Sequence, residues 1–289
     1  MEIKKLEKAS MLKGLDTVVF DLEDGVPMNL KPIGRKNIIE YLSKPRTIIP
    51  ELAIRINAVD SKESMKDLNE VLLNESIAKQ FKSLVIAKVE DPDEVRFVSR
   101  WLKLNNYEHM KILALIETPL GLTKINEICK SSPALDAIIY GAEDYRSASG
   151  ISKEFGDSPI MYARSSLVAS ARAHNLQVID MTSLDFKRSE NVIKEAQLSK
   201  SFGFTGKQVI HPMQIECVNQ AYAPSEKDIN NSIELITRFI RTQIVEGKGV
   251  YGAEGNMVEL PHVKDAVQTL IYGGKAISEI QKIADEALK

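Results

Sequence analysis

Short apolar runs alternate along this chain with longer segments whose apolar residues recur at helical spacing. A short apolar run is typical of a buried strand, and the longer period is typical of an amphipathic helix. Because parallel strands need crossover connections, the alternation predicts a parallel sheet with helices outside it. The predicted strands are residues 17–22, 52–57, 84–89, 112–117, 137–142, 177–181 and 208–211. The longest predicted helices lie at 64–73, 92–104, 161–174 and 189–202.

The regular spacing of these units favours a TIM (β/α)8-type barrel over an open doubly wound sheet. The first element that can be identified is a helix at 2–13, so the barrel is expected to lack its first strand or to have an altered one. We assign the barrel to residues 1–224. Residues 225–289 are expected to form a C-terminal helical segment, a lid or oligomerisation element, whose final helix spans 261–286.

Composition narrows the class of protein. The chain has 289 residues, 44% of them hydrophobic, and a net charge of -2, which argues against a nucleic-acid surface. No apolar run approaches the roughly 20 residues that cross a membrane. Cys129 and Cys217 are too few for a disulfide framework or a structural zinc site. We therefore expect a soluble, intracellular protein, cytoplasmic or mitochondrial, whose partners are small molecules or other subunits.

Charged residues lie at or just after the C-terminal ends of the predicted strands. They are Glu23, Asp24, Arg55, Lys88, Glu90, Glu117, Glu143, Asp144, Asp180 and His211. Since the C-terminal ends of barrel strands face the active-site mouth, these side chains are expected to converge on one pocket. The alternative for each of them is that strand ends are simply more exposed than strand middles.

Glu117 and Asp144 each end an almost wholly apolar run, one βα unit apart. Two oxygen donors on neighbouring strand ends, with room for water and substrate oxygens, suit Mg2+. Arg55 has the planar fork that matches a substrate carboxylate. The alternative is structural, with Glu117 forming a buried ion pair with Arg55 or Lys88.

A set of ordered motifs resembles a known family. The motifs are VVFDLEDGV, RINAVDS, VIAKVE, LIETPLG, GAEDY, ARSSLVASARA, GFTGKQVIHPMQI and GNMVELP. In order and spacing they are similar to the citrate lyase beta-subunit-like family within the HpcH/HpaI aldolase superfamily. The resemblance implies a TIM barrel, usually a homotrimer, that binds Mg2+. It also implies cleavage or formation of a carbon–carbon bond between an acyl-CoA and a small 2-oxo acid.

The resemblance also implies residue roles. Glu117 and Asp144 match the metal ligands, and Arg55 matches the arginine that holds the oxo acid. Glu259 matches a carboxylate of the C-terminal segment that reaches a neighbouring subunit's site for acid–base catalysis. Glu23 and Asp24, together with Lys88, are expected around the metal ligands. The implied reaction splits a 3-hydroxyacyl-CoA such as citramalyl-, malyl- or citryl-CoA into acetyl-CoA and a 2-oxo acid.

Three departures from the family pattern leave other functions open. A first strand of the type RSxLFVPG is lacking, Ala87 replaces a proline, and Glu259 replaces an aspartate. The second hypothesis is therefore a catalytically weak or inactive homologue that serves as a binding or assembly component. A third is a metal-dependent aldolase whose substrate is not a thioester.

Overall fold

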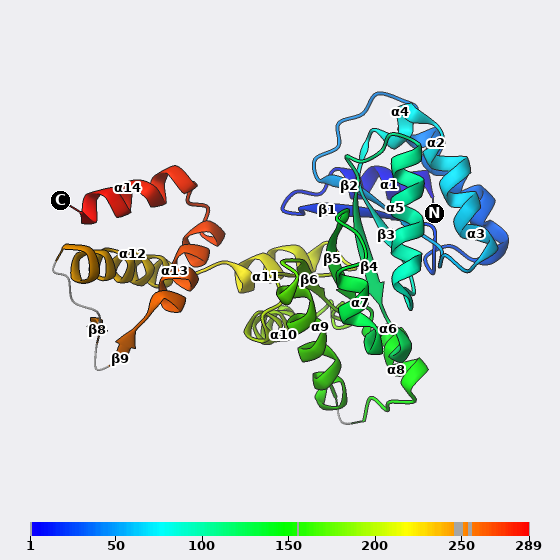
Figure 1. Cartoon of the computed structure of the whole chain (residues 1–289). Helices are drawn as coiled ribbons and strands as arrows, with labels where there is room; N and C mark the ends of the chain where they lie inside the picture. The colour runs from blue at the N-terminus through cyan, green and yellow to red at the C-terminus, as the bar shows by residue number, and fades with distance from the viewer. Residues whose placement is uncertain (1, 155, 246–250, 254–255, 289) are drawn as a thin grey trace. The chain divides into compact units, whose positions relative to one another are not determined.

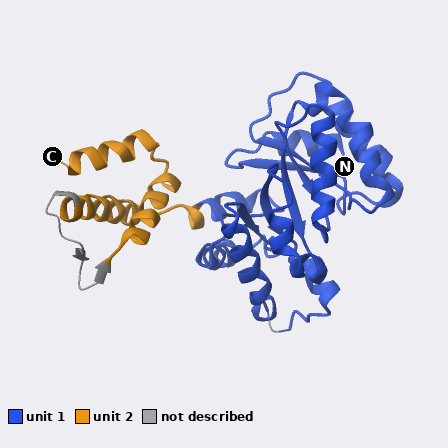
Figure 2. Ribbon diagram, in the orientation of Figure 1, with its two compact units in different colours: residues 1–219 blue, residues 220–289 orange. Residues whose placement is uncertain are grey.

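The computed structural model of the chain describes residues 2–154, 156–245, 251–253 and 256–288. Its internal contacts divide the chain into two units, Met1–Asn219 and Gln220–Lys289 (Figure 2). We describe each unit by itself. The boundary expected at residue 224, and the lid or oligomerisation role of 225–289, stay predictions.

The first unit is built on one parallel sheet of seven strands (Figure 1). The strands are β1 Thr17–Asp21, β2 Glu51–Ile56, β3 Phe81–Ile86, β4 Lys111–Ile116, β5 Leu135–Tyr140, β6 Gln177–Asp180 and β7 Gly206–Lys207. They lie side by side in chain order, and every pairing is parallel. This confirms the predicted α/β class and parallel sheet. Within the described residues, however, β1 and β7 do not pair with each other, so the fold is TIM-barrel-like without a closed barrel being shown.

The structure differs from two predicted strands. Strand β3 ends at Ile86, and the buried residues Ala87 and Val89 of the predicted strand 84–89 belong to the turn that follows. The predicted strand 208–211 is a loop that follows the short strand β7. In both places the apolar residues belong to the loop that follows a strand. The apolar pattern of the sequence does not distinguish such a loop from the end of the strand itself.

Helices and helical turns precede, connect and follow the strands. They are α1 Ile3–Ser10, η1 Met28–Leu30, α2 Lys31–Leu42, α3 Lys62–Lys66, η2 Asp67–Leu72, α4 Glu75–Ala78, α5 Pro92–Leu104, α6 Pro119–Thr123, α7 Ile125–Cys129, α8 Ala142–Ser149, η3 Ser158–Ile160, α9 Met161–Ala173, α10 Ser189–Phe202 and α11 Met213–Tyr222. The predicted bounds of α5 and α10 are confirmed. Helix α5 begins sharply because Asp91 caps it, Pro92 occupies its first position and Glu94 completes a capping box.

The two faces of the sheet bury different side chains. A large cluster that includes Phe20, Ile54 and Ile138 packs between the sheet and the helices. A smaller cluster of Ala53, Val85, Leu115 and Ile139 lies on the opposite face. Because side chains alternate along a strand, residues two positions beyond the smaller cluster continue on its side of the sheet. Arg55 follows Ala53 in this way, and Glu117 follows Leu115.

The described residues of the second unit form three α-helices, one π-helical turn and a pair of antiparallel strands. They are α12 Glu226–Ile240, the π-helical turn η4 Arg241–Val245, β8 Tyr251–Ala253, β9 Asn256–Val258, α13 Leu260–Tyr272 and α14 Ile277–Ala287. The single helix expected at 261–286 is therefore two helices. Gly274, with φ 81°, ends α13 in a left-handed cap in which the Lys275 amide donates to the Leu270 carbonyl at 3.0 Å.

The described helices include none that is both long and apolar enough to span a membrane. Cys129 and Cys217 are free and buried.

Candidate active site

Glu117 and Asp144 lie together at the C-terminal ends of neighbouring strands. Glu117 directly follows β4 and is only 2% exposed, and Asp144 lies in the first turn of α8, just after β5. Burial raises the pKa of Glu117, and the hydrogen bond and negative charge of Asp144 act in the same direction, so that together they bring it to about 8. Two carboxyl groups held in contact need a proton or a cation between them. This pair is therefore a candidate cation site.

The backbone around Glu117 fixes where its carboxylate points. The Lys88 amide donates to Glu117 Oε1 at 2.9 Å, and Lys88 adopts the left-handed conformation, with φ 52°, to present that amide. On the other side, a Cβ added to Gly141 would lie 2.5 Å from both Cβ and Oε2 of Glu117. Only a glycine lets α8 begin so close to the carboxylate.

Two cations lie beside the carboxylate pair, but they do not bind Glu117 through their charged groups. Arg55 Nη1 is 3.1 Å from Glu23 Oε2, and Lys88 Nζ donates to Glu23 Oε1 at 2.5 Å. Lys88 Nζ also lies 3.4 Å from Asp24 Oδ2. The alternative prediction, a buried ion pair between Glu117 and Arg55 or Lys88, is therefore wrong.

Asp21 is the residue of this site that sequence reasoning missed. Its two oxygens accept from Arg55 Nε at 2.7 Å and from Arg55 Nη2 at 2.5 Å, which makes a bidentate pair. Asp21 lies directly opposite Arg55 in the register of β1 and β2. The available signal was its position two residues before Glu23, which follows the same strand, but the register that pairs Asp21 with Arg55 cannot be read from the sequence.

The ionisation states follow from these contacts. Burial opposes the charge on Arg55, but the hydrogen bonds and negative charge of Asp21 outweigh it and raise the pKa of Arg55. Glu23 likewise outweighs burial and raises the pKa of Lys88. Burial also opposes ionisation of Asp21, yet Arg55 holds its pKa below the usual range. Both cations and Asp21 are therefore charged at neutral pH.

Not every predicted site residue joins this cluster. Glu259 is exposed at the N-terminus of α13, in the second unit, where its amide donates to His262 Nδ1 at 3.0 Å. Its role in catalysis stays a prediction. Asp180, expected at the pocket, instead pairs with Arg164 of α9 at 2.5 Å in the buried layer between sheet and helices. It is even-numbered on β6, like the buried Val178, and so faces the helices.

The charge and chemistry of the cluster fit a divalent cation. Five carboxyl groups, of Asp21, Glu23, Asp24, Glu117 and Asp144, accompany the two cations. Among the described residues no group of three or more His, Cys, Asp or Glu side chains could enclose a metal. Two carboxylates with open positions are what Mg2+ commonly uses, because it keeps water or substrate oxygens. The residues present therefore fit Mg2+.

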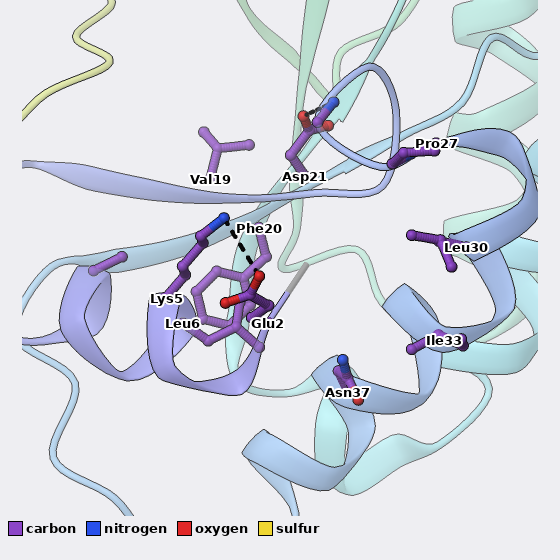
Figure 3. A pocket seen from close by; sticks show the side chains of 12 residues that line it. Glu2, Lys5, Leu6, Val19, Phe20, Asp21, Pro27, Leu30, Ile33 and Asn37 are labelled. Atoms are coloured by element: carbon purple, nitrogen blue, oxygen red, sulfur yellow. Dashed lines mark hydrogen bonds and ion pairs between the residues drawn. The ribbon is translucent and has the colours of Figure 1, made fainter.

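A pocket of about 480 Å3 opens beside β1, between α1 and α2, and reaches the site at Asp21 and Gly25. Val19 and Asp21 project from one side of β1, and Phe20 projects from the other (Figure 3). Much of the lining is apolar, including Leu6, Leu30 and Ile33. Asp21 is thus shared by the candidate site and the pocket.

Comparisons with known proteins identify relatives of this chain. Residues 3–212 match the family model for HpcH/HpaI aldolase/citrate lyase. Mitochondrial citramalyl-CoA lyase of Mus musculus is 34% identical over 289 residues, 96% of this chain and 84% of that protein. Citrate lyase subunit beta of Haemophilus influenzae is 32% identical over 274 residues, 91% of each chain.

Solved structures show the same fold. The CitE protein of Mycobacterium tuberculosis, in complex with magnesium, acetoacetate and coenzyme A, aligns with a TM-score of 0.76 and 26% identity over 94% of each chain. A citrate lyase beta subunit of the same organism, complexed with oxaloacetate and magnesium, aligns with a TM-score of 0.64 over 77% of this chain and 92% of that one. With a family model that covers residues 3–212, this chain belongs to the HpcH/HpaI aldolase/citrate lyase family.

Proposed function

We propose that this protein is a Mg2+-dependent carbon–carbon lyase. It cleaves, or in reverse forms, a 3-hydroxyacyl-CoA such as citramalyl-, malyl- or citryl-CoA, with acetyl-CoA and a 2-oxo acid as the other side of the reaction. The observation that carries the proposal is the contact between the buried Glu117 carboxyl and Asp144, with Arg55 and Lys88 in the same cluster. The relatives support it, because their names describe citramalyl-CoA lyase, citrate lyase and malyl-CoA lyase.

Glu117 and Asp144 would hold Mg2+. When bound, the ion supplies a Lewis acid that stabilises negative charge developing on the substrate's hydroxyl oxygen as the carbon–carbon bond breaks. The Lys88 amide keeps Glu117 in place as a ligand, and Glu23 keeps the Lys88 ammonium beside it. These contacts exist before substrate binds, so the ligands need little reorganisation.

Arg55 would bind the carboxylate of the oxo acid. Its side chain is 22% exposed, so it can meet a substrate while remaining held by Asp21 and Glu23. Glu259, delivered by the segment 225–289 of a neighbouring subunit, would return a proton to the acetyl-CoA enolate. A TIM-type barrel that lacks its first strand or has an altered one, and a homotrimer, belong to this proposal as well.

Location is a further part of the proposal. The mammalian relatives are named as mitochondrial proteins. We place this protein inside the cell, in the cytoplasm or the mitochondrion.

Calorimetric titration of Mg2+ into metal-free protein, with and without pyruvate or oxaloacetate, tests the proposal. We expect binding that tightens with the oxo acid and is lost in Glu117→Gln and Asp144→Asn. The matched control is Glu143→Gln, which removes an exposed carboxylate of the same helix that pairs with Lys153. Folded wild-type protein that binds no Mg2+ would refute the proposal.

Turnover separates the proposed lyase from the alternatives. Citramalyl-, malyl- and citryl-CoA should be tested with release of CoA thioester and oxo acid as the readout. Mg2+ binding without turnover of any of them would favour the inactive binding or assembly component. Turnover of a free hydroxy acid, without CoA binding, would favour the aldolase that needs no thioester.

A further inference from the structure

The Asp21 carboxylate is fully engaged. Oδ1 accepts from the Glu23 amide at 2.8 Å and from Arg55 Nε at 2.7 Å. Oδ2 accepts from the Gly25 amide at 2.9 Å and from Arg55 Nη2 at 2.5 Å. Two donors on each oxygen fix the plane of the carboxylate, and they leave it poorly suited to bind a metal.

The guanidinium of Arg55 is fixed by the same contacts. Arginine has five N–H donors, and the Nε and Nη2 donors along one edge both point to Asp21. Nη1 contacts Glu23. What remains for a ligand is one N–H donor on each terminal nitrogen. A substrate carboxylate can accept from these donors.

We propose that Asp21 is a positioning residue for the reaction: by holding the Nε edge of Arg55, it directs the terminal N–H pair toward the carboxylate of the 2-oxo acid. This rests on the proposed function, because it presumes that Arg55 binds the oxo acid. Asp21 does not touch the substrate, and it acts through the orientation of Arg55.

The local backbone is shaped for this contact. A Cβ added to Gly25 would lie 2.4 Å from Asp21 Oδ2, so the turn after β1 needs a glycine in order to bring its amide to the carboxylate. The depressed pKa of Asp21 agrees with a permanently charged partner for Arg55. Replacing Asp21 with alanine would free a long side chain that must then be ordered at the moment of binding, at a cost in entropy.

The experiment measures pyruvate affinity by calorimetry in the Mg2+-loaded full chain. Asp21→Asn places an amide NH2 against a donor of Arg55 and should weaken pyruvate binding by about 10- to 100-fold. Mg2+ affinity in the absence of pyruvate should change by less than about threefold, because Asp21 is not a ligand. Asp157→Asn, which removes the carboxylate beside the buried Arg146, is the matched control and should leave pyruvate affinity unchanged.

A second background identifies the route of the effect. In Arg55→Lys protein, which keeps the charge and loses the fork, Asp21→Asn should weaken pyruvate binding further by less than about threefold. An equal loss in both backgrounds would show that Asp21 acts independently of Arg55 and would overturn the proposal. So would wild-type pyruvate affinity in Asp21→Asn.

Gly25→Ala keeps the test decisive if Asp21→Asn does not fold. It leaves the carboxylate in the chain and displaces it, and the same dependence on Arg55 is expected. Wild-type protein that binds Mg2+ but no pyruvate would overturn the positioning role and the Arg55 assignment together. Wild-type protein that binds neither would overturn the proposed function as well. Normal pyruvate binding in both Asp21→Asn and Gly25→Ala would overturn the positioning role alone.

Discussion

Gly141 offers a way to disturb the carboxylate pair without changing any charged group. Its backbone has φ -100° and ψ 83°, which alanine can adopt, so Gly141→Ala acts through its added methyl group. That carbon would lie 2.5 Å from Cβ and Oε2 of Glu117, whereas ordinary contacts begin near 3.4 Å. Glu117 must therefore retreat by roughly 1 Å, a displacement that can cost about 100-fold where geometry is critical.

We expect two measurable effects of Gly141→Ala. Mg2+ affinity should fall by about 10- to 100-fold, measured by calorimetry on metal-free protein. Crowding in a packed site should also lower the free energy of unfolding by about 1–3 kcal/mol, measured by urea denaturation. Both effects have one cause, which is the space that Glu117 occupies beside the start of α8.

Gly150→Ala is the control for this experiment. Gly150 ends α8 with φ 65°, and nothing lies within 4 Å of an added Cβ. Alanine there should cost about 1–2 kcal/mol through the left-handed backbone alone and leave Mg2+ affinity unchanged. If Gly141→Ala bound Mg2+ like the wild type, the inferred close approach of Glu117 to the helix start would be wrong.

Two further predictions concern charge. Because the pKa of Glu117 is raised to about 8, a proton competes with the cation for this carboxylate. Mg2+ affinity should therefore increase as the pH rises from 6 to 8 and level off above that. Calorimetric titrations in two buffers of different ionisation enthalpy should show that Mg2+ binding releases protons, and that this release diminishes above pH 8. Asp180→Asn leaves Arg164 buried without its counter-charge and should lower the free energy of unfolding in urea by about 3–5 kcal/mol, while Mg2+ affinity of the folded fraction stays within about threefold of wild type. A pH-independent Mg2+ affinity, or an Asp180→Asn protein as stable as the wild type, would contradict the respective reasoning.

Much of the fold follows from apolar periodicity. Six of the seven apolar runs overlap strands of the sheet, the run 208–211 lies directly after the seventh strand, and α5 and α10 have the predicted bounds. Strand ends were less predictable. The residues that follow Ile86 are apolar because the turn they form is buried against the core. The division of the C-terminal helix depends on one residue, Gly274, whose backbone is left-handed.

The candidate site was predictable in part. Glu117 and Asp144 follow long apolar runs, and the structure brings them together with Arg55, Lys88 and Glu23. The direction of each side chain was not predictable where the exact strand position decides it. Asp180 ends an apolar run just as Glu117 follows one, yet alternation along β6 turns it toward the helices and Arg164.

The strand order of the sheet has a consequence for how this protein is made. Each strand pairs only with its neighbours in the chain, from β1 to β7. Every residue of the carboxylate and cation cluster lies between Asp21 and Asp144, on or just after the first five strands. Once the first half of the chain has emerged from the ribosome, every residue of the cluster has been synthesised. Since domains generally fold from the N-terminus during synthesis, the cation site can assemble while the segment that contains Glu259 is still being translated.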